Sequence, residues 1–502
     1  MKIGKVWLVG AGPSDAGLFT LKGKAVLEQA DVVVYDHLVG SGIMQMIPEH
    51  AECIDVGKVS GNHKVPQEQI NEILLEQALA GKRVVRLKGG DPFLFGRGGE
   101  ELELLVENGV PFEVVPGITS ALSVPAYAGI PVTHRDFTPS LHIVTAHRKR
   151  GDDTPVDYAA LVALGQVTLV FLMGVSALPD ICSGLIRAGK PSDTPAAVLE
   201  KGTTFAQRRV VGTLETLPEL AKLEQIGTPG LIVVGEVCTL AERFHWAEDR
   251  PLGGARVVVT RPQNKASGLG ALLYERGAEV LYLPAIRTEP LCPCADLERL
   301  NDRLSDYAWF VFSSAAGVDA LFSWMREWKL DIRSLSGVRL AAVGAATEAA
   351  LAAHGLLVDY RPAQFNGGAL AEGLAPLIRQ GQKVLAFVPE NTESHSVSAL
   401  REHGVLCDTA QVYRTVFTES EPPELTESDI VAFTSASTVK GFAHICRELD
   451  FSRVQAVCIG KQTAEEAKKY GMRVTVSPEA TLSSMADTIT QLYQNQKGMQ
   501  KI

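Results

Sequence analysis

The first half of the chain repeats one pattern, in which a short run of apolar, β-prone residues ends in a glycine turn. Residues 6–9 lead into Gly10, residues 83–87 lead into Gly89, and a helix-like stretch, residues 21–29, follows the first turn. The strand and glycine pattern recurs at residues 111–117, 168–174 and 231–235. Strands that alternate with helices and end in such turns are typical of parallel sheets with ligand-facing loops. We therefore predict an α/β fold.

The second half contains an internal duplication. Residues 257–288 match residues 384–415 without a gap, so that Pro262 falls on Pro389. The duplication continues with residues 309–322 on 430–443 and residues 341–362 on 456–478. A repeat of this length predicts two similar α/β lobes that face each other across a cleft. Their Ser and Thr loops would then lie at the carboxyl ends of the strands and point inward.

A change of composition separates the two halves. The strand pattern lapses after Val237 into an acidic, aromatic segment, residues 242–249, which is followed by Arg-Pro-Leu-Gly-Gly at residues 250–254. Such a segment is typical of a domain boundary. We predict domains at residues 1–245 and 255–502, joined by a linker at residues 246–254.

Charge and cysteine usage exclude several classes of protein. The 48 Lys and Arg residues are outnumbered by 58 Asp and Glu residues, and a net charge of -10 disfavours nucleic acid as the main partner. Cys292 and Cys294 are the closest pair of eight cysteines and lack zinc-site spacing, so we expect free thiols and no metal. Residues 168–178 are too short to span a bilayer, and the chain start lacks a secretory core. We expect a cytoplasmic protein with no membrane partner.

The first glycine loop, residues 10–15, invites comparison with a dinucleotide-binding fingerprint. Asp15 replaces the third glycine of that fingerprint and would repel a pyrophosphate, and Pro13 removes a backbone donor. A nicotinamide-dependent oxidoreductase is therefore disfavoured, although it stays a rival hypothesis.

Several motifs together carry a family resemblance. They are VGAGPSD at residues 9–15, VVVYDHLV at 32–39, VVRLKGGDPFLFGRGGEE at 84–101, VPGITSALSVPAYAGIPVTHRD at 115–136 and EKGTTFAQRRVVGTL at 200–214. Residues 5–245 thus resemble the uroporphyrinogen-III C-methyltransferases of the tetrapyrrole methylase family. The resemblance implies two α/β subdomains, a homodimer through the N-terminal domain, and S-adenosylmethionine as methyl donor. It also implies methylation of uroporphyrinogen III at C2 and C7 to give precorrin-2, a precursor in sirohaem and cobalamin biosynthesis.

The resemblance assigns residues to the methyl donor. They are Pro13, Gly89, Gly90, Asp91, Leu94, Thr119, Ser120, Met173 and Gly202. Two glycines before Asp91 let a flat ligand approach the backbone, and the carboxylate can accept hydrogen bonds from ribose hydroxyls or attract a sulfonium. The alternative is that the glycines only make turns and that Met173 only packs. Ser14 and Ser120 stand where the family usually has Gly and Ala.

The implied substrate carries eight carboxylates, so an acidic protein must gather positive charge locally. The segment 82–97 holds the cations Lys82, Arg83, Arg86, Lys88 and Arg97 against Asp91 alone. Among them we expect Arg97 to bind a substrate carboxylate, because its planar guanidinium can do so through two hydrogen bonds. The resemblance makes Asp36 the proton acceptor and Lys58 the proton donor, while a surface lysine beside a turn is the alternative for Lys58.

The duplicated half carries a second resemblance. Its motifs are VTRP at residues 259–262, FSSAAGV at 312–318, VGAAT at 343–347, VYRT at 412–415, FTSAST at 433–438 and IGKQTA at 459–464. Residues 255–490 thus resemble the uroporphyrinogen-III synthases, which have two flavodoxin-like lobes. The resemblance implies closure of linear hydroxymethylbilane to uroporphyrinogen III without a metal or organic cofactor.

The synthase motifs supply the candidate site residues of this half. Loss of the hydroxymethyl oxygen as water needs a weak acid, and Tyr413 is the phenol in a motif, although a packed ring is the alternative. The candidates for carboxylate binding are Ser313, Ser314, Thr347, Thr434, Ser435 and Thr463. Four of these hydroxyl residues lie between a strand and an expected helix, where helix capping is the alternative role.

These inferences combine into a bifunctional enzyme that cyclises hydroxymethylbilane and then methylates the product to precorrin-2. A rival from another class keeps the methyltransferase and makes the duplicated half a noncatalytic tetrapyrrole-binding module. Formation of uroporphyrinogen III would separate the two hypotheses.

Overall fold

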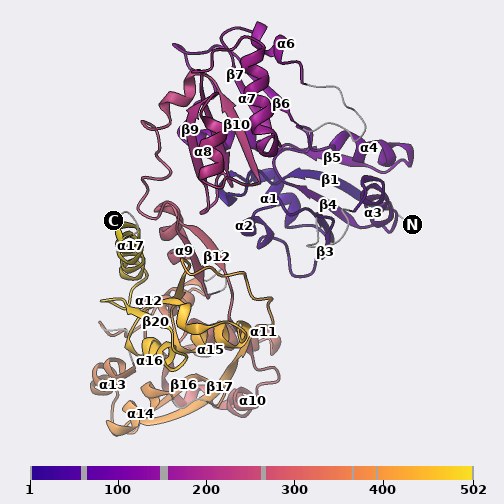
Figure 1. Cartoon of the computed structure of the whole chain (residues 1–502). Coiled ribbons are helices and arrows are strands. Elements are labelled where there is room, and N and C mark those ends of the chain that lie inside the picture. The colour runs from indigo at the N-terminus through magenta and orange to yellow at the C-terminus, as the bar shows by residue number, and fades with distance from the viewer. Residues whose placement is uncertain are drawn as a thin grey trace. The chain divides into compact units, whose positions relative to one another are not determined.

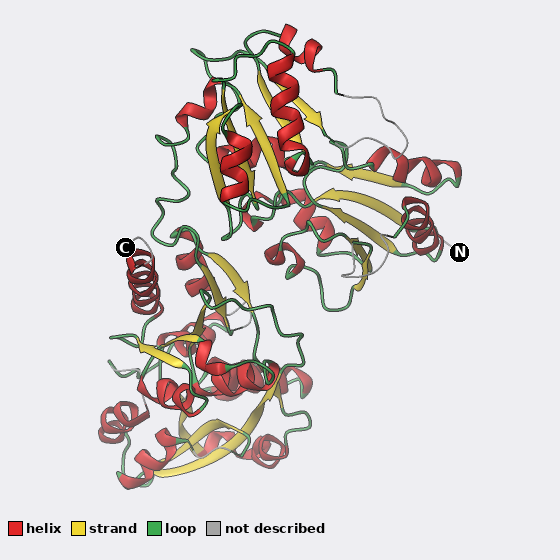
Figure 2. Cartoon of the chain, in the orientation of Figure 1, coloured by secondary structure: helices red, strands yellow, loops and turns green. Residues whose placement is uncertain are grey.

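The structure of the chain is a computed structural model that describes residues 3–57, 65–146, 156–261, 267–363, 367–391 and 394–499. The chain divides into two compact units, and Figure 1 labels the helices and strands of both. The first comprises Met1–Leu283, Pro423–Ala436 and Leu449–Ile502, and the second comprises Pro284–Pro422 and Ser437–Glu448. Each described sheet has five strands, three sheets in the first unit and one in the second, and helices accompany all of them (Figure 2).

The first sheet is wholly parallel, with strand order β3-β2-β4-β1-β5. Its strands are β1 (Lys5–Gly10), β2 (Val32–Tyr35), β3 (Glu52–Asp55), β4 (Arg83–Lys88) and β5 (Phe112–Val115). Its helices are α1 (Leu21–Leu27), α2 (Ser41–Met44), α3 (Gln67–Leu79) and α4 (Gly98–Glu107), whereas α5 (Ser120–Tyr127), which follows β5, packs against the core of the second sheet. Val32 and Val34 enter one core cluster while Val33 enters another, so both faces of the sheet are buried. The valine runs of the sequence are the signature of such strands.

The second sheet has the order β6-β7-β10-β8-β9 and is mixed. Its strands are β6 (Leu141–Thr145), β7 (Thr168–Leu172), β8 (Pro195–Glu200), β9 (Arg208–Thr213) and β10 (Gly230–Val234), with helices α6 (Tyr158–Ala163), α7 (Leu178–Arg187) and α8 (Leu217–Leu223). β6 and β7 are parallel, whereas the other pairs are antiparallel. The expectation of parallel sheets is therefore wrong for this sheet. Only residues 201–207 join β8 to β9, which is too short for a parallel crossover.

The third sheet is parallel in the order β12-β11-β18-β19-β20. Its strands are β11 (Arg256–Val259), β12 (Glu279–Tyr282), β18 (Ile430–Phe433), β19 (Gln455–Cys458) and β20 (Arg473–Val476), with helices α9 (Ser267–Glu275), α16 (Lys461–Lys469) and α17 (Leu482–Met499).

The fourth sheet has the order β13-β17-β16-β14-β15 and is parallel except at β13. Its strands are β13 (Ile286–Pro290), β14 (Tyr307–Phe312), β15 (Arg339–Ala342), β16 (Lys383–Pro389) and β17 (Leu406–Phe417). The helices of this part are α10 (Ala295–Leu300), α11 (Ala315–Glu327), α12 (Ala345–Ala353), α13 (Gly367–Leu374), α14 (His395–Glu402) and α15 (Ala436–Ile445).

The two predicted lobes are present, but each sheet draws strands from both repeats. The third sheet joins β11 and β12 of the first repeat to β18, β19 and β20 of the second, and the fourth sheet makes the reciprocal combination. The residues between β12 and β13 are only 283–285, so the chain cannot add a parallel neighbour there and continues in the other sheet. The repeats are therefore exchanged between lobes rather than folded one after the other.

The helices of the described residues also bear on membrane association. None of them is long and apolar enough to cross a bilayer.

Candidate functional site

The glycine turns after β1, β4 and β5 meet at one edge of the first sheet. Gly12 and Gly90 exchange backbone hydrogen bonds, with N–O distances of 3.1 and 2.8 Å. A Cβ on Gly117 would lie 2.2 Å from the carbonyl oxygen of Gly90, and a Cβ on Gly10 would lie 2.5 Å from Gly117 Cα. Only glycine permits this approach of the three turns. The Cβ position of Gly90 itself, at a φ of +71°, has open space within 4 Å, so this face of the turn is accessible.

Asp91 organises the loop that follows β4. Its Oδ1 accepts hydrogen bonds from the amides of Phe93 and Leu94 at 2.8 and 3.1 Å, and its Oδ2 accepts one from Gly117 at 3.0 Å. The carboxylate therefore ties the β4 turn to the β5 turn. Oδ2 keeps capacity for one further donor, because a carboxylate oxygen has two acceptor sites.

Residues with left-handed backbone conformations concentrate in the loops after β1, β4, β7 and β8. They are Ser14, Phe95, Arg97, Met173, Lys201 and Thr203, with φ values of 113°, 53°, 59°, 58°, 45° and 68°. For a residue with a side chain, such a conformation costs about 1–3 kcal/mol and persists where function or packing imposes it. Met173 is also 46% exposed despite its apolar side chain. These loops are therefore the strongest candidates for a ligand site in this half.

The remaining residues predicted to bind the methyl donor lie in the same loops or pack beside them. The Thr203 hydroxyl donates a hydrogen bond to the carbonyl of Pro13 at 2.7 Å, which joins the β1 loop to the β8 loop. Gly202 packs so closely on Val124 that a Cβ there would lie 2.2 Å from a methyl carbon. Leu94 packs against the core of the second sheet.

The start of α5 contributes the last two of these residues. Thr119 caps the helix, since its hydroxyl accepts a hydrogen bond from the amide of Ala121 at 3.3 Å, and Ser120 is the first helical residue. Thr119 therefore has a structural role as the N-cap of α5.

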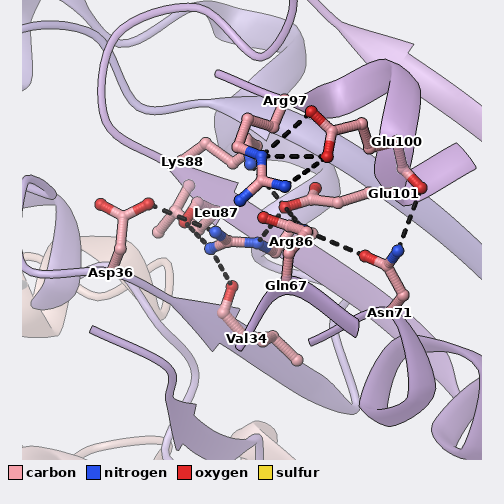
Figure 3. A network of polar contacts seen from close by, with 10 residues as sticks. All are labelled: Val34, Asp36, Gln67, Asn71, Arg86, Leu87, Lys88, Arg97, Glu100 and Glu101. Atoms are coloured by element: carbon pink, nitrogen blue, oxygen red, sulfur yellow. Dashed lines mark hydrogen bonds and ion pairs between the residues drawn. The ribbon is translucent and has the colours of Figure 1, made fainter. Parts of the chain in front are cut away.

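A buried polar network lies beside the β4 turn (Figure 3). Glu101 has no exposed surface, and its Oε1 accepts hydrogen bonds from Lys88 at 2.6 Å and from Arg86 at 3.2 Å. Gln67 of α3 donates to the same oxygen at 3.3 Å. The other carboxylate oxygen of Glu101, Oε2, has no hydrogen-bond partner among the described residues. Burial and the neighbouring Arg86 lower the pKa of the Lys88 ammonium, while Glu101 opposes that change.

Asp36, the predicted proton acceptor, belongs to this network. It follows β2 and is 25% exposed, and its Oδ2 lies 3.4 Å from the guanidinium of Arg86, which is 4% exposed. Its Oδ1 accepts a hydrogen bond from the amide of Leu38 at 3.1 Å. Arg86 also donates to the carbonyls of Val34 and Leu87 at 3.3 and 3.0 Å. Asp36 is therefore held in place from two sides while one face of its carboxylate reaches solvent. Lys58, the predicted proton donor, lies outside the described residues.

The cations that the sequence gathers around β4 all have carboxylate partners within the chain. Besides the buried pair, Lys82 contacts Glu52 at 2.8 Å and Arg83 contacts Asp31 at 2.6 Å. Arg97 contacts Glu100 through hydrogen bonds of 3.0 Å, and both side chains are about half exposed. The segment therefore does not present the free positive charge that its composition suggests, and a substrate carboxylate at Arg97 would share the guanidinium with Glu100. The partners of Lys82 and Arg83 come from elements distant in the sequence, which is why local sequence could not identify them, whereas Glu100 lies only three residues from Arg97.

In the second unit, Tyr413 and Ser314 form a pair. The Ser314 hydroxyl lies 2.9 Å from the Tyr413 hydroxyl and also accepts a hydrogen bond from the amide of Gly317, so that it caps α11. Tyr413 is 7% exposed, and burial raises the pKa of its phenol, although Ser314 opposes this change. The phenol therefore stays protonated at neutral pH and remains able to donate a proton. Ser313 directly follows β14, and Thr347 lies 4% exposed in α12.

The equivalent positions in the third sheet are also partly buried. Thr434 and Ser435 follow β18, and Thr463 lies 5% exposed in α16. Sequence reasoning missed their neighbour Arg261, which follows β11. Arg261 is partly buried, and no hydrogen bond or ion pair joins its guanidinium to any residue that the structure describes. The available signal was a cation placed directly after a buried strand.

Comparison with known proteins assigns both halves. Residues 5–218 match the model of the tetrapyrrole (corrin/porphyrin) methylases, and residues 267–487 match the model of uroporphyrinogen-III synthase HemD. The chain is 43% identical over 498 residues to the porphyrin biosynthesis protein HemD of Ruminiclostridium josui, which covers 98% of this chain and 99% of that protein.

Other relatives match the first half. The siroheme synthase 2 of Yersinia enterocolitica is 55% identical over 243 residues, 48% of this chain and 50% of that protein, so the chain spans about half the length of this relative. Among solved structures, the uroporphyrin-III C-methyl transferase of Thermus thermophilus, complexed with S-adenyl homocysteine, is 40% identical over 47% of this chain and 99% of that one, with a TM-score of 0.41.

Proposed function

Because this chain belongs to the family of the porphyrin biosynthesis protein HemD, we propose that it closes hydroxymethylbilane to uroporphyrinogen III and then methylates that product at C2 and C7 to precorrin-2. The first half is a tetrapyrrole methylase, and the second half is related to uroporphyrinogen-III synthase. The observation that supports the proposal most strongly is the match of both family models within this chain, together with a relative that aligns over 98% of it. The two activities would act on consecutive metabolites.

The residues around Gly90 fit S-adenosylmethionine as the methyl donor. Open space lies on the Cβ side of Gly90, Asp91 Oδ2 keeps an acceptor site, and Met173 offers exposed apolar surface for a flat ring. The proposed contacts are those assigned from the family motifs, Pro13, Gly89, Gly90, Asp91, Leu94, Thr119, Ser120, Met173 and Gly202. When bound, the sulfonium supplies an electrophilic methyl group.

Asp36 is proposed to remove a proton from the methylated ring system. A proton acceptor needs an oriented carboxylate, and Arg86 and the amide of Leu38 fix that of Asp36. The carboxylate is 25% exposed, which leaves it access to a substrate. Arg97 is proposed to bind a substrate carboxylate in competition with Glu100.

Tyr413 is proposed as the weak acid that protonates the leaving hydroxyl of hydroxymethylbilane. Its raised pKa keeps the proton on the phenol, and Ser314 orients the hydroxyl. The other hydroxyl residues, Ser313, Thr347, Thr434, Ser435 and Thr463, are proposed to contact the substrate's carboxylates.

The purified full chain, supplied with hydroxymethylbilane and S-adenosylmethionine labelled on its methyl group, tests the proposal. We expect uroporphyrinogen III without the methyl donor, and a doubly labelled product when the donor is present. Formation of the type I isomer alone would show that the linear precursor cyclises spontaneously and would favour the noncatalytic binding module. If uroporphyrinogen III is supplied together with the labelled methyl donor and acquires no label, the proposed methyltransferase activity is refuted.

A further inference from the structure

Arg261 differs from the paired cations around β4 because no counter-charge contacts it among the residues that the structure describes. It follows β11, an inner strand of the third sheet, and is partly buried. Burial lowers the pKa of its guanidinium, and no neighbouring charge contributes to that change. At the other end of the same strand, Arg256 is held by Asp429 at 2.8 Å and by the carbonyl of Glu424 at 2.8 Å. The fold thus neutralises the arginine at the start of β11 and leaves the arginine just beyond its end without a partner among the described residues.

The surroundings of Arg261 favour an anion. β11, β18 and β19 are neighbours in the sheet and run parallel, so their carboxyl ends lie along one edge. The first two residues after each of these three strands include no aspartate or glutamate. Lys461, the first residue of α16, adds an exposed second cation two strands from Arg261, about 10 Å away by strand spacing.

The duplicated counterpart shows that the fold does not require these cations. Val388, 3% exposed in a hydrophobic core cluster, stands where the first repeat has Arg261, and Ala345 stands where the second repeat has Lys461. The strand equivalent to β11 is β16, and it leads into Glu390, an acid. Two repeats with the same strand and helix pattern therefore differ in charge at this edge, and the positive charge belongs to one lobe.

We propose that Arg261 binds a carboxylate side chain of the linear tetrapyrrole, with Lys461 as a weaker second contact. The inference rests on the proposed synthase function, because it takes hydroxymethylbilane as the polycarboxylate that enters this half. Closure of the ring expels water and keeps all eight carboxylates, so the product carries the same groups. A guanidinium can bind a carboxylate through two parallel hydrogen bonds, and one that is already partly desolvated does so with less competition from water. The arginine is therefore a substrate-binding residue that orients one end of the bilane.

The test measures the initial rate of uroporphyrinogen III formation by the full chain against the concentration of hydroxymethylbilane. For Arg261→Met we expect KM to rise about tenfold or more, with a smaller change in kcat, because a charge-assisted contact is lost. Arg261→Lys keeps the charge but loses the planar fork and should lie between the wild type and Arg261→Met. For Lys461→Met we expect about a threefold rise in KM, since an exposed charge contributes less.

Arg453→Met is the matched control. Arg453 lies in the same lobe just before the amino end of β19 and pairs with Glu427 at 2.8 Å, so its removal should leave KM unchanged. Arg261→Lys keeps the test valid if Arg261→Met does not fold. A KM of either Arg261 variant within twofold of the wild type and of Arg453→Met would overturn the inference while leaving the synthase function intact. A wild-type chain that makes no type III isomer would instead overturn the synthase function, and the inference with it.

Discussion

Two regions of this protein place an arginine on a parallel strand or just beyond its end, and the charge is paired in one region and unpaired among the described residues in the other. Arg86 of β4 is 4% exposed and lies between Asp36 and Glu101, whereas Arg261 after β11 has no partner among the described residues. A buried cation that the chain neutralises holds side chains in place, as Arg86 holds Asp36. A partly buried cation without a counter-charge is available to a ligand. Positive charge in a sequence motif therefore indicates anion binding only where the fold supplies no carboxylate.

The largest effect is expected at Asp36, the solvent-facing member of the ion-pair network around Arg86. Asp36→Asn should lower the rate of methyl transfer to supplied uroporphyrinogen III by about a hundredfold to ten-thousandfold, because the substituted amide no longer accepts a proton. Binding of S-adenosylmethionine, measured by calorimetry, should stay within twofold of the wild type. Asp31→Asn, which removes a carboxylate at the amino end of the same sheet, is the matched control. A normal rate in Asp36→Asn would remove Asp36 from the mechanism.

Glu101, at the buried centre of the network around Arg86, should contribute more to the free energy of unfolding than the exposed ion pairs do. Glu101→Gln leaves Arg86 and Lys88 without their shared negative charge and should lower the free energy of unfolding by about 3–5 kcal/mol. Denaturant unfolding of the full chain measures this loss. Glu100→Gln, at the exposed partner of Arg97, should change it by less than about 1 kcal/mol. Equal effects of the two substitutions would show that burial does not distinguish these ion pairs.

The paired Arg256, at the start of the strand that Arg261 follows, sharpens the comparison. Asp429 is 3% exposed and holds Arg256, so Asp429→Asn should lower the free energy of unfolding by about 2 kcal/mol. The rate of hydroxymethylbilane turnover per folded molecule should not change. A loss of turnover without a loss of stability would mean that the paired end of β11 also contacts the substrate.

The smallest effect is expected at the exposed pair of Arg83 and Asp31. Hydrogen bonds from Arg83 lower the pKa of Asp31 to about 2 from the usual 3.8. Since the folded value is the lower one, the pair stabilises the protein above about pH 4, and this contribution is lost as the pH falls toward 2. The stability difference between the wild type and Asp31→Asn should shrink over that interval in denaturant titrations. A difference that stays constant from pH 6 to pH 2 would contradict the lowered pKa.

The elements that follow local patterns were predictable from the sequence. The valine runs became the strands of the first sheet, and the glycine turns after β1, β4 and β5 meet, as a parallel sheet requires. The antiparallel pairing of β10 was not predicted, because a glycine after a strand does not fix the direction of its neighbour. The exchange of strands between the repeats also escaped prediction, since it depends on a connection of only three residues, 283–285.

Some features of the candidate site were also predictable from the sequence, and others were not. Gly90, Asp91 and Thr119 lie in the loops where the motifs predicted them, because their backbone roles are local. The partners of the buried cations could not be predicted, since Glu101 reaches Lys88 from α4 and Asp36 reaches Arg86 from the end of β2. That no described residue pairs with Arg261 is likewise a property of the fold that local sequence does not reveal. Pairing of charges depends on distances that the sequence does not contain.

One measurement tests this contrast most directly: the free energy of unfolding of Arg86→Met and Arg261→Met, compared in the same full chain by denaturant titration. Arg86→Met should lose about 3–5 kcal/mol, because Asp36 and Glu101 lose their shared buried cation. Arg261→Met should lose nothing or gain up to about 1 kcal/mol, because it removes a partly desolvated charge to which no described residue contributes a counter-charge. A loss at Arg261 as large as that at Arg86 would show that the fold needs this arginine, and would contradict its assignment to a ligand.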